Sequence, residues 1–336
     1  MNTAAPASAI AVAGLRKSYG DKVVLDGVDL SVAEGTVFCL LGPNGAGKTT
    51  AVRILSTLIP ADAGQVFVAG HDVGRESDAV RGSIGVTGQF SAVDGLLTGR
   101  ENLMLMANLH HLPGRQRRQR ADELLLRFDL VDAADKKAAT YSGGMRRRLD
   151  LAMTLVGNPR IIFLDEPTTG LDPRSRRTMW QIVRDLVERG VTIFLTTQYL
   201  DEADELADRI AVLDQGRIVA TGTSAELKRR VPGGHIRLVF ADEAHVADAE
   251  RILDGATREG DLALNVPGDS GVRAVRALFT RLDDAGIEVE SFSVHTPDLD
   301  DVFFALTGHA TEDTQAIDSE STRGESASQE TKESVR

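Results

Sequence analysis

Cysteine, aromatic residues and long apolar runs are all scarce in this sequence of 336 residues. The single cysteine, Cys39, excludes an internal disulfide and a metal site built from several thiolates. It lies in the apolar run 37–41, which indicates an inert, buried thiol. Aromatic residues are only 4% of the chain, so we expect a core built mainly from Val, Leu, Ile and Ala.

No apolar run approaches the ~18–20 residues needed to cross a bilayer. Residues 1–13 are rich in alanine but contain no basic residue, so they do not resemble a signal peptide. We therefore expect a cytoplasmic protein that reaches a membrane only through a partner.

Positive charge is in the minority, because 38 Lys and Arg face 50 Asp and Glu, for a net charge of −12. Nucleic-acid binding relies on a positive field over the surface, so this balance argues against a nucleic-acid partner. The hydrophobic share of 42% and the charged share of 26% are ordinary for a globular protein with a sizeable core. The length suits about two domains.

Short β-rich runs alternate with helical patterns through the first two thirds of the chain, which indicates an α/β fold with a mostly parallel sheet. Strands are expected at 23–25, 28–32, 36–41, 65–69, 83–87, 161–164, 191–196 and 210–213. Helices are expected at 50–58, 102–112, 116–128, 174–189 and 201–209.

Pro232-Gly233-Gly234 marks a candidate domain boundary. A small α/β module is expected beyond it at 235–308, with strands at 236–240, 262–266 and 287–294 and helices at 244–253 and 271–285. The acidic segment 309–336 has almost no large apolar residue, so we expect it to be disordered.

Residues 42–49 fit the phosphate-binding pattern G-x-x-x-x-G-K-[ST], between an expected strand and an expected helix. Glycines let backbone N–H groups converge on phosphate oxygens, and the helix start adds the positive end of its dipole. Lys48 would reach the β- and γ-phosphates of a nucleotide, and the Thr49 hydroxyl would bind Mg²⁺. The alternative is a glycine-rich turn with a solvated lysine. The predicted nucleotide-binding residues of this segment are Gly42, Pro43, Asn44, Gly45, Ala46, Gly47, Lys48, Thr49 and Thr50.

Two carboxylates follow the buried apolar run 161–164. Asp165 is costly at this position unless it meets a cation or hydrogen bonds, and contact with Mg²⁺ supplies that need. Glu166 is the candidate base that polarises the attacking water, an effect worth ~10²–10⁴ in rate. A helix-capping Asp-Glu pair before Pro167 is the alternative, but it leaves the neighbouring phosphate-binding pattern unexplained.

The segment Ser142-Gly143-Gly144-Met145 lies 23 positions before Asp165, and in this context it resembles the signature motif of ATP-binding-cassette (ABC) ATPases. The resemblance implies a P-loop ATPase core at 9–232 that uses ATP and Mg²⁺. It also implies a mixed sheet, an antiparallel β subdomain and a helical subdomain at about 90–158. Ser142, Gly143 and Gly144 would then bind nucleotide.

Three further residues take roles from this resemblance. Tyr19 resembles the aromatic residue that stacks on adenine, although a partly exposed strand tyrosine is the alternative. Gln89 occupies the Q-loop position, which implies that it contacts Mg²⁺ and water. The alternative is a plain polar loop residue. Asp172, in Gly170-Leu171-Asp172, resembles the D-loop that contacts the opposite subunit, and its alternative is a helix N-cap. The implied Mg²⁺ ligands are thus Thr49, Gln89 and Asp165.

The chain departs from most of the family after the strand at 191–196, where Gln198 replaces a histidine that contacts the γ-phosphate. Glutamine can donate a hydrogen bond but cannot act as an acid or base, so turnover would be modest while binding survives. Glu166 and Gln198 are therefore the predicted catalytic residues. The same glutamine occurs in the daunorubicin-resistance type of ABC ATPase, which the chain also resembles at 88–94, 141–150 and 299–308.

The resemblance implies a homodimer in which each ATP lies between the P-loop of one chain and the signature of the other. ATP binding and hydrolysis would drive a separate polytopic permease at the inner face of the membrane. The expected function is an exporter ATPase for a hydrophobic small molecule, either a drug, an antibiotic or a lipid. The module at 235–308 would regulate or dimerise the chain. A soluble ABC ATPase acting on nucleic acid or ribosomes and a non-hydrolysing regulatory module remain as alternatives.

Overall fold

The computed structural model describes residues 8–89, 91–230, 234–267, 271–295 and 297–307. Internal contacts divide the chain into two units, 1–224 and 225–336, which are described separately below. The sequence placed this division at Pro232-Gly233-Gly234, of which only Gly234 is among the described residues. The segment 309–336, expected to be disordered, lies outside the described residues.

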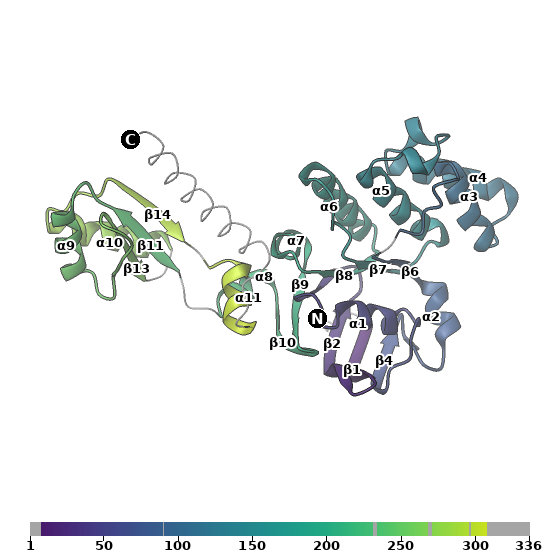
Figure 1. Cartoon of the computed structure of the whole chain (residues 1–336), viewed down its shortest axis with the longest axis horizontal. Helices are drawn as coiled ribbons and strands as arrows, with labels where there is room; N and C mark the ends of the chain where they lie inside the picture. The colour runs from purple at the N-terminus through teal and green to yellow at the C-terminus, as the bar shows by residue number, and fades with distance from the viewer. Residues whose placement is uncertain (1–7, 90, 231–233, 268–270, 296, 308–336) are drawn as a thin grey trace, which may run out of the picture. The chain divides into compact units, whose positions relative to one another are not determined.

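A six-stranded sheet lies at the centre of the first unit, in the order β10-β9-β3-β8-β7-β6 (Figure 1). Five strands are parallel, and β10 pairs antiparallel with β9 at one edge. The strands are β3 (Val37–Leu41), β6 (Ile84–Thr87), β7 (Ile161–Asp165), β8 (Thr192–Thr197), β9 (Arg209–Asp214) and β10 (Arg217–Gly222). Every residue of β3, β7 and β8 is buried, as expected for parallel strands that are covered on both faces. The prediction of a mostly parallel sheet is confirmed, but β10 was not predicted.

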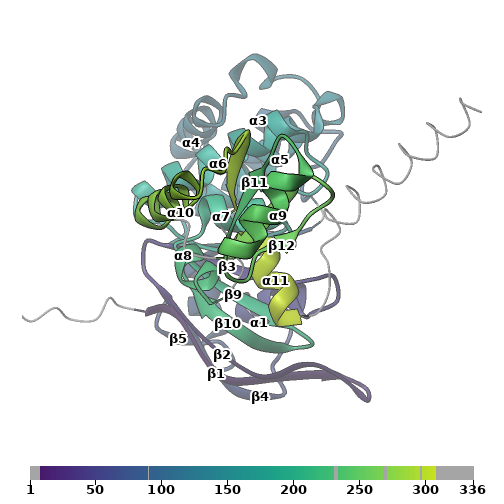
Figure 2. The same ribbon diagram turned by 90° about the vertical axis from the view of Figure 1, so that its left-hand side faces the viewer.

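A second, antiparallel sheet has the order β2-β1-β4-β5 and lies to one side of the first (Figure 2). Its strands are β1 (Ser8–Tyr19), β2 (Lys22–Ala33), β4 (Ala63–Val68) and β5 (His71–Asp72). The sequence predicted two short strands on either side of Asp26-Gly27, which is wrong, because β2 is continuous. Gly27 adopts a φ of 72° where the pairing with β1 shifts register, so a bulge absorbs the turn-forming glycine within the strand.

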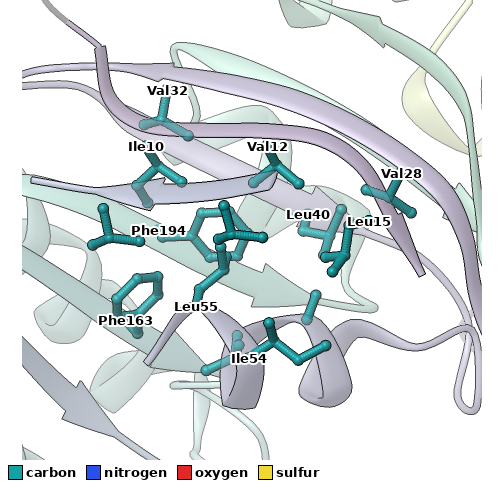
Figure 3. Close-up of a cluster of buried hydrophobic side chains, with 14 of the residues drawn as sticks. Ile10, Val12, Leu15, Val28, Val32, Leu40, Ile54, Leu55, Phe163 and Phe194 are labelled. Carbon is teal, nitrogen blue, oxygen red and sulfur yellow. The ribbon is translucent and has the colours of Figure 1, made fainter. Parts of the chain in front are cut away.

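Helix α1 (Lys48–Leu55) packs between the two sheets and completes the main hydrophobic core. Figure 3 shows Ile54 and Leu55 of this helix below Ile10 of β1, beside Phe163 and Phe194 of the six-stranded sheet. The rings of Phe163 and Phe194 lie 5.6 Å apart between centroids. Most other members of the core are Val, Leu, Ile and Ala, as the composition predicted. This core fixes α1, and therefore the loop before it, against the sheet.

Cys39 lies in the middle of β3 and is fully buried. Burial raises the pKa of its thiol well above the usual value, which favours the uncharged form. The prediction of an inert thiol thus agrees with its surroundings.

Helices between β6 and β7 form the region that the sequence assigned to a helical subdomain. They are α3 (Gly99–Leu109), α4 (Gly114–Arg127) and α5 (Gly143–Thr154). Elsewhere in the first unit lie α2 (Ser77–Ser83), α6 (Pro173–Glu188) and α7 (Leu200–Leu206). The helix predicted at 201–209 is shorter than expected, because Arg209 already belongs to β9 and pairs with β3.

The second unit contains the order β11-α9-β12-β13-α10-β14, with an antiparallel sheet arranged β12-β13-β11-β14. This is the βαββαβ topology of ferredoxin-like folds. The strands are β11 (His235–Val239), β12 (Thr257–Arg258), β13 (Ala263–Pro267) and β14 (Ser291–His295). The helices are α8 (Ser224–Lys228), which begins at the division between the units, α9 (Glu243–Ile252), α10 (Val272–Asp284) and α11 (Leu299–Thr307).

A separate core joins α9 and α10 to one face of this sheet, through Val246 and Leu282 against Leu238 and Leu264. The strand predicted at 287–294 begins only at Ser291. Ile287 instead lies in the connection after α10, where it packs into the same core. Across both units, no described helix combines the length and apolar character needed to span a membrane.

Candidate active site

The predicted phosphate-binding loop connects β3 to α1 and needs glycine at two positions. Gly47 has a φ of 112°, and a Cβ there would lie 2.9 Å from the Val24 carbonyl oxygen. A Cβ at Gly42 would lie 2.3 Å from the carbonyl oxygen of Leu213. The loop is thus pressed against β2 at one end and β9 at the other, so its backbone is held in place by the surrounding fold.

The Lys48 side chain is folded into this loop and is only 4% exposed. Its Nζ donates to the carbonyl oxygens of Gly42 (2.7 Å) and Pro43 (3.2 Å) and lies 3.4 Å from Oε1 of Glu166. Burial lowers the pKa of Lys48, and the attraction of Glu166 opposes that shift. Lys48 is therefore not the solvated lysine of an ordinary turn. It is a buried cation that an incoming anion can reach.

Asp165, at the end of β7, is 3% exposed and is held by two hydroxyl groups. Thr49 Oγ1 donates to Asp165 Oδ1 at 3.3 Å, and Thr196 Oγ1 donates to the same oxygen at 2.5 Å. Hydroxyl and carboxylate oxygens are the donors that Mg²⁺ prefers. Within the described ranges no group of three or more His, Cys, Asp or Glu is placed to hold a metal. The oxygens of Thr49 and Asp165 fit a Mg²⁺ that takes its remaining ligands from water and phosphate.

Glu166 has a φ of 49°, a left-handed backbone conformation that costs a non-glycine residue ~1–2 kcal/mol. Its backbone N–H donates to the carbonyl oxygen (3.0 Å) and to Oγ1 (3.2 Å) of Thr196. This conformation turns the side chain toward Lys48, and strain of this kind is concentrated at functional sites. The helix-capping alternative does not apply, since the next helix begins at Pro173.

Lys48, Thr49 and Glu166 border a cavity of about 350 Å³, a size typical of small-molecule sites. Nine predicted residues line it: Pro43, Asn44, Gly45, Gly47, Lys48, Thr49, Thr50, Gln89 and Glu166. Lys22 and Val24 of β2 also line it, and sequence reasoning missed both. No local motif marks them, because β2 approaches the P-loop through tertiary packing of Val24 and Leu25 against Gly47.

The geometry agrees with what is known of similar proteins. The ABC transporter family model matches residues 25–169. The daunorubicin resistance ATP-binding protein DrrA2 of Streptomyces coeruleorubidus is 52% identical over 314 residues, which cover 92% of this chain and 98% of that protein. The chain belongs to the ABC transporter family. Within it, the chain is of the daunorubicin-resistance type, and it is an ATP-hydrolysing ABC ATPase.

Solved ABC structures share the fold of the cassette. A nucleotide-free ATP-binding cassette from an ABC transporter is 26% identical, with a TM-score of 0.61, and the match covers 66% of this chain and 94% of that one. A dimeric post-hydrolysis cassette bound to ADP and Pi is 28% identical, with a TM-score of 0.58, and covers 64% and 98%. The predicted P-loop ABC ATPase fold is therefore confirmed.

Several predicted site residues of this ABC ATPase lie outside the cavity lining. Gly42 and Ala46 lie in the P-loop, and Asp165 is the last residue of β7. None of these three residues borders the cavity. Tyr19 ends β1, is 47% exposed and lies with its ring centroid 5.6 Å from the ammonium of Lys17. Gln198 directly follows β8 and is half-buried.

The signature segment starts helix α5 and packs against the start of α6. Ser142 is the N-cap of α5, and Ser142 and Gly143 are exposed. A Cβ at Gly144 would lie 2.5 Å from Ser175 Oγ, so only glycine fits this contact without movement. Asp172 caps α6 by accepting from the backbone N–H groups of Arg174 and Ser175, both at 3.0 Å. It also accepts from Ser175 Oγ (2.6 Å), a bond that lowers the pKa of the Asp172 carboxyl. The structure thus shows Asp172 in the role of a helix N-cap.

Proposed function

We propose that this ABC ATPase is the nucleotide-binding subunit of an exporter for a hydrophobic small molecule, either a drug, an antibiotic or a lipid. The arrangement of Lys48, Thr49 and Glu166 around one cavity, with Asp165 hydrogen-bonded to Thr49, is the observation that carries the proposal. The relatives named for daunorubicin resistance support a drug as cargo. A separate polytopic permease would provide the membrane path.

The P-loop would bind the triphosphate through its backbone N–H groups and through Lys48. The ammonium group now donates to two loop carbonyls, and phosphate oxygens are stronger acceptors that would compete for it. Thr49 and Asp165, with Gln89 at the cavity edge, would hold Mg²⁺. The metal would offset the negative charge on the phosphates. Tyr19 would stack on the adenine ring.

Glu166 would orient the attacking water and accept its proton. Its carboxylate lies 3.4 Å from Lys48, so a triphosphate that attracts Lys48 would release Glu166 toward the water. Gln198 would donate a hydrogen bond to the γ-phosphate without taking part in proton transfer. Because the glutamine amide cannot act as an acid or base, we expect modest ATP turnover.

A second copy of the chain would complete each site. Ser142 and Gly143 are exposed and do not border the cavity of their own chain, so they are available to a nucleotide held by a partner. Each chain has one P-loop and one signature, so a head-to-tail homodimer would contain two complete sites. Asp172 would lie at the contact between the chains, and Gly144 would support the signature from behind.

The remaining assignments concern location and control. We place the dimer at the inner face of the cell membrane, bound to its permease. The ferredoxin-like unit would regulate turnover or stabilise the dimer. A nucleic-acid partner is not expected, because the net charge of the chain is −12.

The proposal is tested by expressing the chain with a candidate permease in drug-sensitive bacteria. The wild type should lower the accumulation of fluorescent daunorubicin, and the ATPase should co-purify with the permease. Glu166→Gln should reduce ATPase activity ~10²-fold or more while MgATP binding persists. Equal drug accumulation with and without functional Glu166, or co-purification with ribosomes or DNA instead of the permease, would contradict the proposal.

A further inference from the structure

Arg147, on the helix that begins at the signature, donates hydrogen bonds to four backbone carbonyl groups around the active site. Arg147 lies in the first half of α5, five positions after Ser142. Its guanidinium donates to carbonyl oxygens of two separate loops. These are Gly88 (2.9 Å), Asp165 (3.2 Å), Glu166 (3.3 Å) and Pro167 (2.9 Å).

Arg147 is also largely shielded from solvent and forms an ion pair. Its side chain is 11% exposed, and Nη1 lies 3.4 Å from Oδ2 of Asp150, whose own side chain is 4% exposed. The other oxygen of Asp150 accepts from the backbone N–H of Ala92 at 3.1 Å. The pair therefore connects α5 to both flanks of Gln89, through Gly88 before it and Ala92 after it.

The contacts explain how Glu166 keeps its unfavourable backbone conformation. Thr196 holds the N–H side of Glu166, and Arg147 holds the carbonyl groups before, at and after this residue. The planar fork of an arginine can reach several acceptors at once, whereas a lysine is a point charge on a flexible stem. Apart from Arg147, the Glu166 carbonyl oxygen accepts one long hydrogen bond, from the Thr169 N–H at 3.4 Å. Loss of the fork would therefore remove the closer restraint on the carbonyl side of this left-handed residue.

We propose that Arg147 is a positioning residue that clamps Glu166 in its left-handed conformation and links it to the Gln89 loop and the signature helix. This inference rests on the proposed function of Glu166. In the proposed dimer the signature contacts the partner's nucleotide, while Glu166 serves the nucleotide of its own chain. A displacement of α5 at one site would therefore reach the catalytic carboxylate of the other site through a single side chain.

The test compares Arg147→Gln and Arg147→Lys with the matched control Arg148→Gln. Arg148 is on the same helix and donates to the carbonyl oxygens of Phe128 (2.9 Å) and Asp129 (3.2 Å), which belong to neither active-site loop. Steady-state MgATP hydrolysis should show kcat at least tenfold lower in Arg147→Gln, with KM and nucleotide affinity within twofold of wild type. Arg147→Lys should recover part of kcat, and Arg148→Gln should stay within twofold.

Hydrogen exchange of the nucleotide-free chain provides a readout that does not need activity. Peptides covering 163–169 should exchange faster in Arg147→Gln and not in Arg148→Gln, whereas peptides covering 126–131 should respond only to the latter. Unchanged exchange at 163–169, or losses of kcat and affinity that parallel those of Arg148→Gln, would overturn the positioning role. Absence of ATPase activity in the wild type would defeat the proposed function instead, and the exchange result would still decide whether Arg147 clamps the loop.

Discussion

Replacing Lys48 with alanine should abolish tight MgATP binding. The ammonium is 4% exposed, and its three donors are directed to two loop carbonyls and toward Glu166. A triphosphate would take over at least one of these as a charge-assisted hydrogen bond, worth ~1.5–3 kcal/mol. Since 1.4 kcal/mol is about a tenfold change, Kd should rise about 10- to 150-fold.

Binding is best measured by titration calorimetry with a slowly hydrolysed ATP analogue and Mg²⁺ at physiological salt. Lys22→Ala is the matched control, because Lys22 lines the same cavity from β2 but is exposed to solvent. Its removal should change Kd by less than about threefold, since exposed ion pairs contribute ~0–1 kcal/mol. A Kd for Lys48→Ala within twofold of wild type, or an equal loss in Lys22→Ala, would refute the assignment of the phosphate site. Circular dichroism of both variants checks that they are folded.

Three further predictions concern Glu202, Gly144 and Thr49. Burial raises the pKa of Glu202 in α7 above its usual value, so stability falls as the pH rises from the unfolded-state pKa to the higher folded-state pKa. Glu202→Gln should therefore raise the free energy of unfolding, measured by urea denaturation, by ~1–3 kcal/mol at pH 8 and should give no gain near pH 4. Equal effects at both pH values would contradict this prediction. Gly144→Ala should cost ~1–3 kcal/mol by overpacking against Ser175, and Ser175→Ala should recover part of the loss in the double variant, whereas additive losses would exclude the contact. Thr49→Val should raise the Mg²⁺ concentration needed for half-maximal ATPase activity, and an unchanged Mg²⁺ titration would remove Thr49 from the ligand set.

The parts of the site that depend on adjacent residues were predictable from the sequence. The P-loop could be recognised because its glycines, Lys48 and Thr49 are contiguous and act through their own backbone. Asp165 and Glu166 could be recognised because an apolar run ends in two carboxylates. In both cases residues that are adjacent in the sequence supply nearly all of the chemical groups that the site needs.

The missed parts depend on contacts between distant segments. In the sequence Arg147 is one of three consecutive arginines at 146–148, and its acceptors lie 59 residues before it and 18 to 20 residues after it. Strand β10 was missed because its residues range from exposed to buried, unlike those of the wholly buried β3, β7 and β8. At Gly27 the sequence predicted a break between two strands where β2 is continuous. The glycine, which usually ends a strand, is accommodated there by a bulge.

The position of Cys39 has a practical consequence. The only native thiol is sealed between β8 and β9 and held in its unreactive form, so maleimide reagents should leave the folded wild type unmodified. A cysteine introduced at an exposed position outside the proposed site, such as Arg177 of α6, would then be the sole labelling site, without any need to remove the natural one. Fluorescent or spin labels placed there on two copies of the chain would report directly on when the copies approach each other during the ATP cycle.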